Sequence, residues 1–285
     1  MPKRAIKKEQ PSKFSLSTLL KHQEEALSTQ PAIKVRDGQT PLKGNVLDRL
    51  ADMVKRAQKL RRDGVTVELE AKIGFLREGV FVAGVCQGRF RFLLEWLIQS
   101  NLSASRWEET VVTHKGSCRE ILNKRSCTIE CHEKKRIEDI VLLSTHPEGV
   151  CFKFSLSTEE PTESVEVKQL VAPTSATSTV RLRQRRSFAI PSKSLSNGED
   201  AFRVDFTLAW MGKSERIAKE RQRQGKETAR EIEIELVSSA YLLKHDADHV
   251  AESLYAKVAS LFSSEMPETR DFNVEVVSVR DQKQT

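Results

Sequence analysis

The sequence predicts a mainly β protein of the α+β kind, a closed antiparallel β-barrel with flanking α-helices. Two runs of alternating glutamates carry this prediction, Glu68-x-Glu70 in VELEAKI and Glu231-x-Glu233-x-Glu235 in REIEIELV. Because strand side chains point alternately to opposite faces, each run gives its strand one acidic and one apolar face. The segments VRLRQRRSFAI and FRVDFTLAW alternate in the same way but carry basic residues. A closed barrel turns such charged faces inward while helices cover the apolar faces.

The chain is expected to form one folded domain with a tail at each end. Residues 1–40 are rich in Lys, Ser, Gln and Pro and lack sustained periodicity, which predicts a flexible basic tail. Residues 41–270 hold the barrel with its helices, and residues 271–285 are a C-terminal tail. At 285 residues the chain is long enough to bury a substantial core.

The first folded elements are two helices with an acidic strand between them. Between residues 46 and 60 apolar residues recur at helical spacing, which predicts an amphipathic helix. Gly64 marks the turn into the strand VELEAKI, and VFVAGV follows that strand. The apolar residues of RFRFLLEWLIQS fit a second helix, which we expect to cover barrel wall.

Several short strands occupy the middle of the chain, between Trp107 and Val171. The strand-favouring segments are ETVVTHK, CREIL, RIEDIVLLS, VCFKFSLS and SVEVKQLV. Turn-prone stretches separate them at residues 115–116, 146–149 and 158–162. Short strands in succession are typical of antiparallel architecture.

The last third continues the barrel and ends in a helix. Two long strands are expected at residues 179–190 and 201–210, on either side of the turn LSNGED. The polar segment GKSERIAKERQRQGKE is either an exposed loop or a surface helix. After REIEIELV, apolar residues recur between Leu243 and Leu261 at helical spacing, which predicts a C-terminal amphipathic helix.

Composition favours an anionic partner and a reducing compartment. The formal charge is +7 and the isoelectric point is about 9.1, values that many proteins without a nucleic-acid partner also reach. Five cysteines form an odd set without a repeated CxxC spacing. No apolar run approaches the length needed to cross a bilayer, so we expect a soluble intracellular protein with no membrane partner.

The charged rows are informative only in combination. A single ExE tripeptide is more typical of a solvated edge strand, and VRLRQRR alone of a solvent-facing basic strand or an RNA patch. Together, acidic rows suit a divalent metal, which prefers hard oxygen ligands, and basic rows suit phosphate oxygens, which Arg binds in bidentate fashion. A barrel interior with both would suit a polyphosphate.

In this order, VELEAKI, VRLRQRRSF, FRVDFTLAW and REIEIELV resemble segments of the metal-dependent RNA 5′-triphosphatases of fungal and protozoan mRNA capping. These enzymes belong to the triphosphate tunnel metalloenzyme superfamily. The resemblance spans residues 46–262 and includes ECHEKKRIEDIVLL and FKFSLSTEEP.

The resemblance implies a role for each charged row. It implies that Mg²⁺ or Mn²⁺ is bound by Glu68, Glu70 and Glu235. It implies phosphate binding by the residues Lys72, Arg119, Lys135, Arg181, Arg183 and Arg185. It implies catalytic roles for Glu159, which would position the attacking water, and for Glu233 and Arg183. Glu160, next to Glu159, is the alternative water-positioning residue. The supporting wall would consist of Arg203, Asp205, Thr207 and Glu231.

The implied activity is that of a polynucleotide 5′-phosphatase, a hydrolase that removes the γ-phosphate from nascent RNA during cap formation. The expected partners are 5′-triphosphate RNA, free nucleoside triphosphates and a guanylyltransferase. The expected location is the nucleus, although PKRAIKK is more typical of a solvated basic tail than of a nuclear-import signal. The alternatives are a nucleoside triphosphate or tripolyphosphate hydrolase of the same fold, and a non-catalytic RNA-end binding protein.

Overall fold

The computed structural model describes residues 43–100, 102–115, 117–144, 150–162, 179–192, 195, 199–225, 229–263 and 274–277. Its strands are β1 (Val67–Arg77), β2 (Val80–Ala83), β3 (Glu108–Lys115), β4 (Cys118–Asn123), β5 (Ile129–Ser144), β6 (Val150–Pro161), β7 (Thr179–Pro191), β8 (Asp200–Gly212), β9 (Ala229–Leu236) and β10 (Val274–Val277). Its helices are α2 (Lys43–Arg62), α3 (Gln87–Gln99), α5 (Glu215–Arg223), α6 (Ser239–Lys244) and α7 (Ala247–Ser263).

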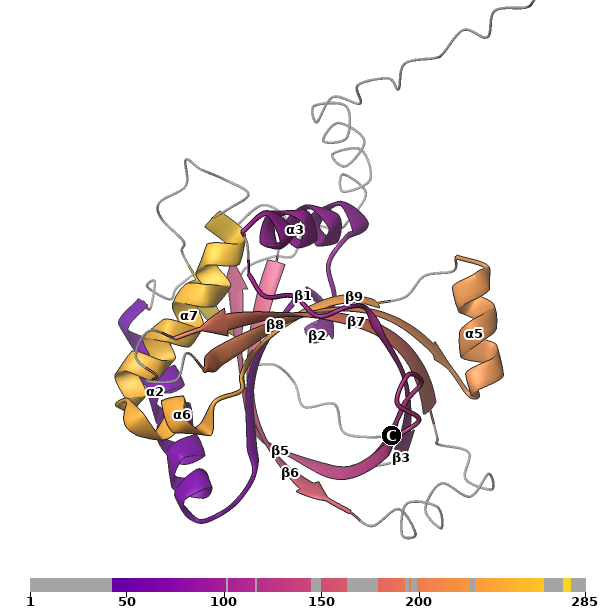
Figure 1. The fold of residues 1–285 in the computed structure, drawn as a ribbon. Helices are drawn as coiled ribbons and strands as arrows, with labels where there is room; N and C mark the ends of the chain where they lie inside the picture. Colours follow the sequence, from indigo (N-terminus) through magenta and orange to yellow (C-terminus); the bar gives the residue numbers. More distant parts are fainter. Residues whose placement is uncertain are drawn as a thin grey trace, which may run out of the picture. The chain divides into compact units, whose positions relative to one another are not determined.

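Eight antiparallel strands close into a barrel, which Figure 1 shows as a ring. The order around the ring is β5, β4, β3, β7, β8, β9, β1 and β6, and β6 pairs with β5 again to complete it. β2 pairs with the end of β1 that β9 leaves free, and β10 pairs with the end of β5 that β4 leaves free. The closed antiparallel barrel with flanking helices confirms the predicted fold class.

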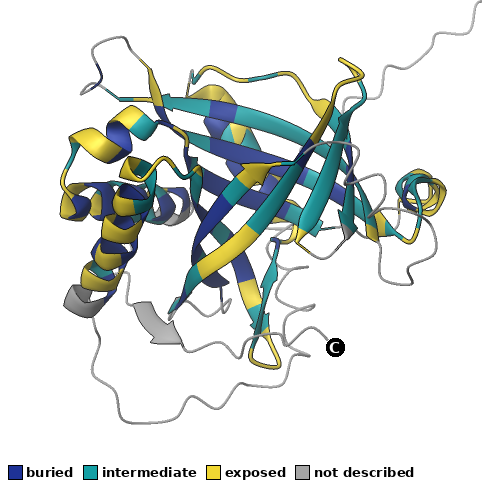
Figure 2. Cartoon of the chain, turned by 90° about the horizontal axis from the view of Figure 1, so that it is seen from below, coloured by how far each residue is buried: buried dark blue, intermediate teal, exposed yellow. Residues whose placement is uncertain are grey.

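The main core lies between the outer face of the barrel and its helices. Outward side chains such as Leu69 of β1, Ile234 of β9 and Phe154 of β6 are buried in one cluster with Val54 of α2 and Leu254 of α7. Helices α2, α6 and α7 lie together beside the ring, and α3 lies against another part of its wall (Figure 1). Figure 2 shows that the helix surfaces turned away from the barrel are exposed. The apolar faces of the strands are therefore covered by helices, and the charged faces are left for the interior.

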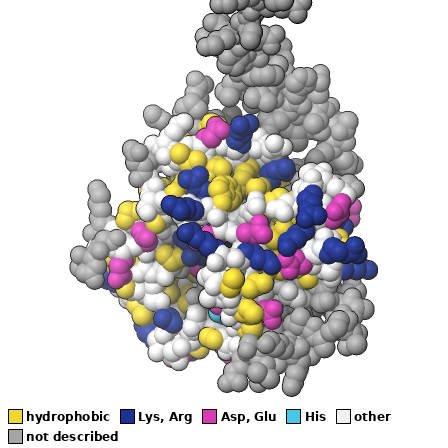
Figure 3. Space-filling view, turned by 45° about the vertical axis from the view of Figure 1, so that its right-hand side comes forward, with side chains coloured by type: hydrophobic (Ala, Val, Ile, Leu, Met, Phe, Trp, Pro, Cys, Tyr) yellow, Lys and Arg dark blue, Asp and Glu magenta, His cyan; other side chains and the backbone are white. Residues whose placement is uncertain are grey.

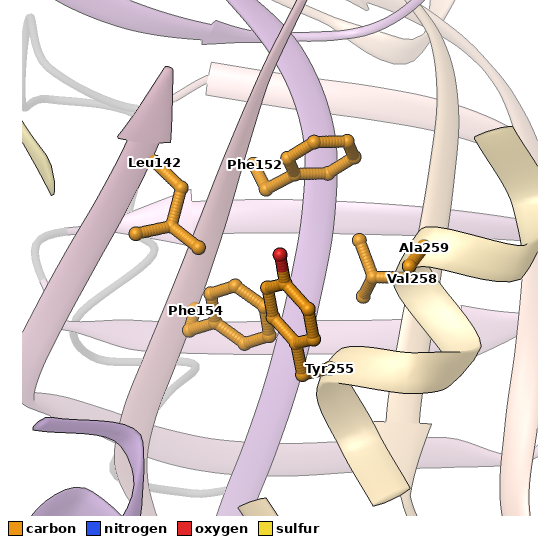
Figure 4. A pocket seen from close by; sticks show the side chains of 6 residues that line it. All are labelled: Leu142, Phe152, Phe154, Tyr255, Val258 and Ala259. Carbon is orange, nitrogen blue, oxygen red and sulfur yellow. The ribbon is translucent and has the colours of Figure 1, made fainter. Parts of the chain in front are cut away.

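A small apolar pocket lies within this contact between α7 and the barrel wall. Its lining consists of Leu142, Phe152, Phe154, Tyr255, Val258 and Ala259, shown in Figure 4. No charged side chain lines it, so it offers nothing to hold a phosphate group.

Helix α5 covers a second, smaller core. Ser214 caps the helix by accepting a hydrogen bond from the backbone N–H of Ile217. Ala218 of α5 is buried against Val111 of β3 and Leu182 of β7. Of the two structures predicted for GKSERIAKERQRQGKE, the surface helix is the one present.

Three local predictions differ from the structure. The turn predicted at residues 158–162 is wrong, because β6 stays paired with β5 and continues as a strand to Pro161. The C-terminal helix is two helices, α6 and α7, separated at residues 245 and 246. Within residues 271–285, expected as a tail, β10 pairs with β5. The predictions for the tail at 1–40, the turn at 146–149 and the strand SVEVKQLV lie outside the described residues. Among the helices that the structure describes, none is long and apolar enough to span a bilayer.

Candidate active site

Strand register places the two acidic rows side by side on the interior face of the barrel. Glu70 of β1 is directly opposite Glu235 of β9, and Lys72 is opposite Glu233. The intervening residues Leu69 and Ala71 point the other way and are buried against the helices. Directly opposed like charges destabilise a sheet unless cations offset them. The interior therefore has to supply positive charge beside these glutamates.

Glu233 is the centre of the resulting ion-pair network. Its carboxylate, largely buried, accepts hydrogen bonds from the ammonium group of Lys72 at 2.8 Å and from the guanidinium of Arg185 at 3.1 Å. Burial raises the pKa of Glu233, but Lys72 and Arg185 outweigh burial and hold it well below its usual range. Burial lowers the pKa of Lys72, but the carboxylates of Glu233 and Glu70 raise it by more than burial lowers it. Both groups are therefore charged at neutral pH.

Three of the other four glutamates of these rows, Glu68, Glu70 and Glu235, also contact cations. Lys134 of β5 contacts Glu68 and lies 3.4 Å from a Glu70 oxygen, and Lys72 lies 3.1 Å from the other Glu70 oxygen. The guanidinium of Arg203 donates to Glu235 at 2.6 Å. Burial raises the pKa of Glu235 to about 7. The charge of Arg203 lowers this pKa, and the charge of Glu68 raises it further. Ionised Glu235 therefore lacks full charge compensation.

The basic strand β7 sends three arginines into the same interior. Arg181 pairs with Glu231, and Arg185 pairs with Asp205 at 2.9 Å as well as with Glu233. Asp205 also pairs with Arg203, so the predicted wall residues Asp205, Thr207 and Glu231 contact basic groups, and Arg203 contacts carboxylates.

Arg183 is different from its neighbours on β7. Its Nε donates to the Thr110 hydroxyl at 3.2 Å, and within the described residues no carboxylate pairs with it. Burial, together with the charges of Arg185 and Arg181, lowers the pKa of Arg183 to about 9. The interior therefore holds one guanidinium whose charge is opposed by its surroundings, as expected at a site for an anion.

Glu159, and not Glu160, faces the interior. Glu159 lies on β6 opposite Lys134, and its carboxylate pairs with Arg119 of β4. Glu160 is exposed on the other face of the strand. The strand structure at residues 158–161, where a turn was predicted, is what brings Glu159 to Arg119.

The placement expected for Lys135 needs correction. Lys135 lies on the outer face, where its side chain is 58% exposed and lies 3.4 Å from Glu133. The adjacent Lys134 points inward to Glu68. A β-bulge between Arg136 and Glu138 inserts one residue into β5, and this shifts every residue before it to the opposite face.

The interior also contains residues that were not among the predicted site residues. They are Lys134, Asp139, Lys153, Ser155 and His114. Strand alternation in FKFS and TVVTH places Lys153, Ser155 and His114 on the polar faces of their strands. Alternation does not predict the inward position of Lys134, because the bulge in β5 changes the face on which Lys134 lies. Asp139 accepts from the Ser155 hydroxyl at 2.7 Å and lies 3.8 Å from Lys153.

Carboxylates on β1 and β9 have the right chemistry for a hard divalent cation. Glu68, Glu70 and Glu235 occupy neighbouring positions on adjacent strands, and each already contacts a cationic side chain that a metal charge would replace. Within the part of the chain that the structure describes, no three His, Cys, Asp or Glu side chains are gathered as metal ligands. Lys134 and Arg203 would have to release Glu68 and Glu235 before these carboxylates could bind a metal together with Glu70.

Positive charge is also present on the outer surface. On the face shown in Figure 3, Lys and Arg side chains gather near a group of hydrophobic side chains, with a few Asp and Glu among them. Together with the net charge of +7, this favours approach of an anionic partner.

Comparison with known proteins extends the description of the fold. The chain is similar to the Pct1 RNA triphosphatase of S. pombe, with a TM-score of 0.50 and 16% identity over 83% of this chain and 97% of that one. It is also similar to the Mimivirus capping enzyme triphosphatase, with a TM-score of 0.47 and 16% identity over 79% of this chain and 98% of that one. No protein-family model and no curated protein matches the sequence. The chain therefore has the tunnel fold of the S. pombe enzyme.

Proposed function

We propose that the protein is a metal-dependent RNA 5′-triphosphatase that removes the γ-phosphate from nascent transcripts in cap formation. The diphosphate end that remains would then be the substrate of a guanylyltransferase, and the location would be the nucleus. Three observations support the proposal: the shared fold, the acidic rows on β1 and β9, and the basic row on β7 beside them.

The observation that carries the proposal is the distribution of ion pairs in the interior. Nearly every interior carboxylate is held by a Lys or Arg, whereas Arg183 has no carboxylate partner in the described residues. When a divalent cation takes the carboxylates and a triphosphate takes the arginines, each charged group exchanges one partner for another of the same sign. Such an exchange avoids leaving a buried charge unpaired, which is the expensive outcome in a low-dielectric interior.

A metal bound by Glu68, Glu70 and Glu235 would withdraw charge from the γ-phosphate oxygens and orient the phosphoryl group. Lys134 and Arg203, released from these glutamates, would then be free to contact phosphate oxygens. The remaining pairs of Glu233 with Lys72 and Arg185 would keep those cations in fixed positions.

The hydrolysis adds water across the terminal phosphoanhydride bond. Water oxygen bonds to the γ-phosphorus as the bond to the β–γ bridging oxygen breaks, giving inorganic phosphate and a 5′-diphosphate end. Arg183, with its two charged neighbours on β7, would stabilise the negative charge spread over the transferring oxygens. Glu159 would accept a hydrogen bond from the attacking water when Arg119 turns to the phosphate.

The test is phosphate release from γ-labelled 5′-triphosphate RNA and from ATP, each with Mg²⁺, with Mn²⁺ and with a chelator. We expect metal-dependent release from the RNA by the full chain. Two pairs of adjacent residues provide matched variants, because in each pair one side chain faces the interior and the other faces outward. Glu159→Gln and Lys134→Ala are expected to reduce the rate by about 10²-fold, and Glu160→Gln and Lys135→Ala to leave it unchanged.

The outcome separates the candidate functions. Release from ATP or tripolyphosphate without release from RNA would favour a hydrolase of free triphosphates. Binding of triphosphate RNA without any release, in Mg²⁺ and in Mn²⁺, would favour the RNA-end binding protein. Equal losses in the inward and outward variants would contradict the proposed site.

A further inference from the structure

His114 is an interior residue that the proposed mechanism leaves without a role. It shares one face of β3 with Thr110, whose hydroxyl accepts the hydrogen bond from Arg183. In the barrel, His114 is directly opposite Arg119 on β4 and directly opposite Thr179 on β7. The imidazole therefore lies between the two strands that carry the arginines of the site.

The four charges with the largest effect on His114 come from three strands and are positive. They are Arg119 of β4, Arg181 and Arg183 of β7, and Lys134 of β5. Three of these cations form ion pairs. Arg119 pairs with Glu159, Arg181 with Glu231 and Lys134 with Glu68. Burial, followed by the charges of Arg181 and Arg119, lowers the pKa of His114 to about 4. Without a ligand, roughly one imidazole in 1,000 would carry a proton at pH 7.

We propose that His114 is a phosphate-binding residue that takes up a proton from solvent when a triphosphate enters the barrel, and that it then donates a hydrogen bond to the phosphate. This inference rests on the proposed function. A triphosphate would neutralise the same four cations that oppose protonation, and its oxygens accept hydrogen bonds. A charged imidazole donates from both ring nitrogens, whereas the neutral ring donates from only one.

Proton uptake makes triphosphate affinity depend on pH through this one residue. Bound phosphate brings the pKa of His114 from about 4 back toward or above its ordinary value of 6.5. If the pKa in the complex is about 7, linkage predicts that protonation strengthens binding about tenfold at pH 6 and hardly at all at pH 8. The ratio of wild-type to variant affinity should change by that factor across this range.

The experiment uses inorganic tripolyphosphate and the full chain without divalent metal, so that hydrolysis does not interfere. Calorimetric titration at pH 6 in two buffers of different ionisation enthalpy measures the protons taken up on binding. Affinities of wild type, His114→Gln and His245→Gln are then measured from pH 6 to pH 8. His245 lies between α6 and α7, outside the barrel, and serves as the matched histidine control.

The expected result is uptake of close to one more proton by wild type and His245→Gln than by His114→Gln, with an affinity ratio that grows about tenfold from pH 8 to pH 6. Nuclear magnetic resonance of the histidine rings in wild type gives a second measurement that needs no variant. One interior imidazole should change from neutral to charged as tripolyphosphate is added at pH 6.

Two results would overturn the inference, and they differ in what they say about the proposed function. Tight tripolyphosphate binding with equal proton uptake in all three proteins removes the role of His114 and leaves the proposed function intact. Absence of tripolyphosphate binding, together with absence of phosphate release from triphosphate RNA, removes both.

Discussion

Arg183 shows how one buried charge without a carboxylate partner in the described residues can lower the stability of the fold. Its neighbours Arg181 and Arg185 are stabilised by carboxylates, but Arg183 meets a hydroxyl group and the repulsion of those neighbours. Burial and this repulsion lower the pKa of Arg183 to about 9. Below that pH, Arg183 is charged in both the folded and the unfolded protein. The free-energy cost of this charge arises only in the folded state, and it does not change with pH near neutrality.

Arg183→Gln is therefore expected to raise the melting temperature at pH 7 while lowering turnover by about 10²-fold. The amide keeps a hydrogen-bond donor for Thr110 but removes the opposed charge. Thermal unfolding without metal or phosphate measures the first effect, and phosphate release from triphosphate RNA measures the second.

A matched substitution on the same strand is Arg185→Gln. It leaves Asp205 and Glu233 with one cation fewer, so the melting temperature should fall. A loss of stability in Arg183→Gln comparable with that of Arg185→Gln would contradict the unpaired state of Arg183 and favour a structural role.

At the scale of elements, alternation predicts the sides of a strand as long as the ladder is regular. The rows in VELEAKI, VRLRQRR, FRVDF and REIEIEL share faces as their alternation predicts, because the paired stretches of β1, β7, β8 and β9 that carry them are uninterrupted. Pairing with β5 also explains why TEEP is strand and not turn. Residues that favour turns stay extended here because β5 pairs with all four of them, and the backbone N–H of Glu159 donates to the carbonyl of Thr66.

Strand β5 is the element whose faces the sequence could not predict. Counting back by twos from the buried outward residues Ile140 and Leu142 makes Lys135 an inward residue. After the bulge, the alternation holds, and Glu138 faces α2 and pairs with Arg56. Before the bulge, the extra residue reverses the faces, so Lys134 points inward and Lys135 points outward. A bulge depends on the register in which β5 pairs with β6, and nothing in ECHEKKRIEDI marks its position.

The β1–β2 hairpin depends on a glycine in β1. A Cβ atom at Gly74 would lie 2.2 Å from the carbonyl oxygen of Val82 and 2.7 Å from the ring of Phe81. The first of these contacts is with backbone and cannot be relieved by a rotamer change. Gly74→Ala is expected to separate β2 from β1, seen as faster amide hydrogen exchange at residues 80–83 and a lower melting temperature.

The turn of the same hairpin supplies the control. Glu78 and Gly79 both have positive φ, 53° and 81°, the pattern of a type I′ turn, which Asn also adopts readily. Gly79→Asn should therefore leave exchange at residues 80–83 unchanged. Unchanged exchange in Gly74→Ala would mean that the hairpin can shift to make room.

At the scale of the whole molecule, the interior is a set of charges of both signs that compensate one another across neighbouring strands. A divalent cation alone would have to displace Lys134 and Arg203 from their glutamates and leave them unpaired. A triphosphate alone would draw the same Lys134 and Arg203 toward its oxygens and leave Glu68 and Glu235 unpaired. Each ligand thus creates the charge that the other one needs, which makes their binding cooperative if the proposed function holds.

We therefore expect the two ligands together to stabilise the fold more than the sum of their separate effects. The measurement is thermal unfolding with Mn²⁺, with a triphosphate whose terminal bridging oxygen is replaced by NH, and with both. A coupling free energy of about 1–3 kcal/mol, typical for two sites that influence each other, corresponds to an affinity gain of about 5- to 150-fold. Glu68→Gln should abolish the coupling, because the variant removes a carboxylate from both exchanges, whereas the outward variant Glu160→Gln should retain it. Strictly additive shifts in wild type would contradict the exchange of partners, since each ligand would then bind without changing the charges that face the other.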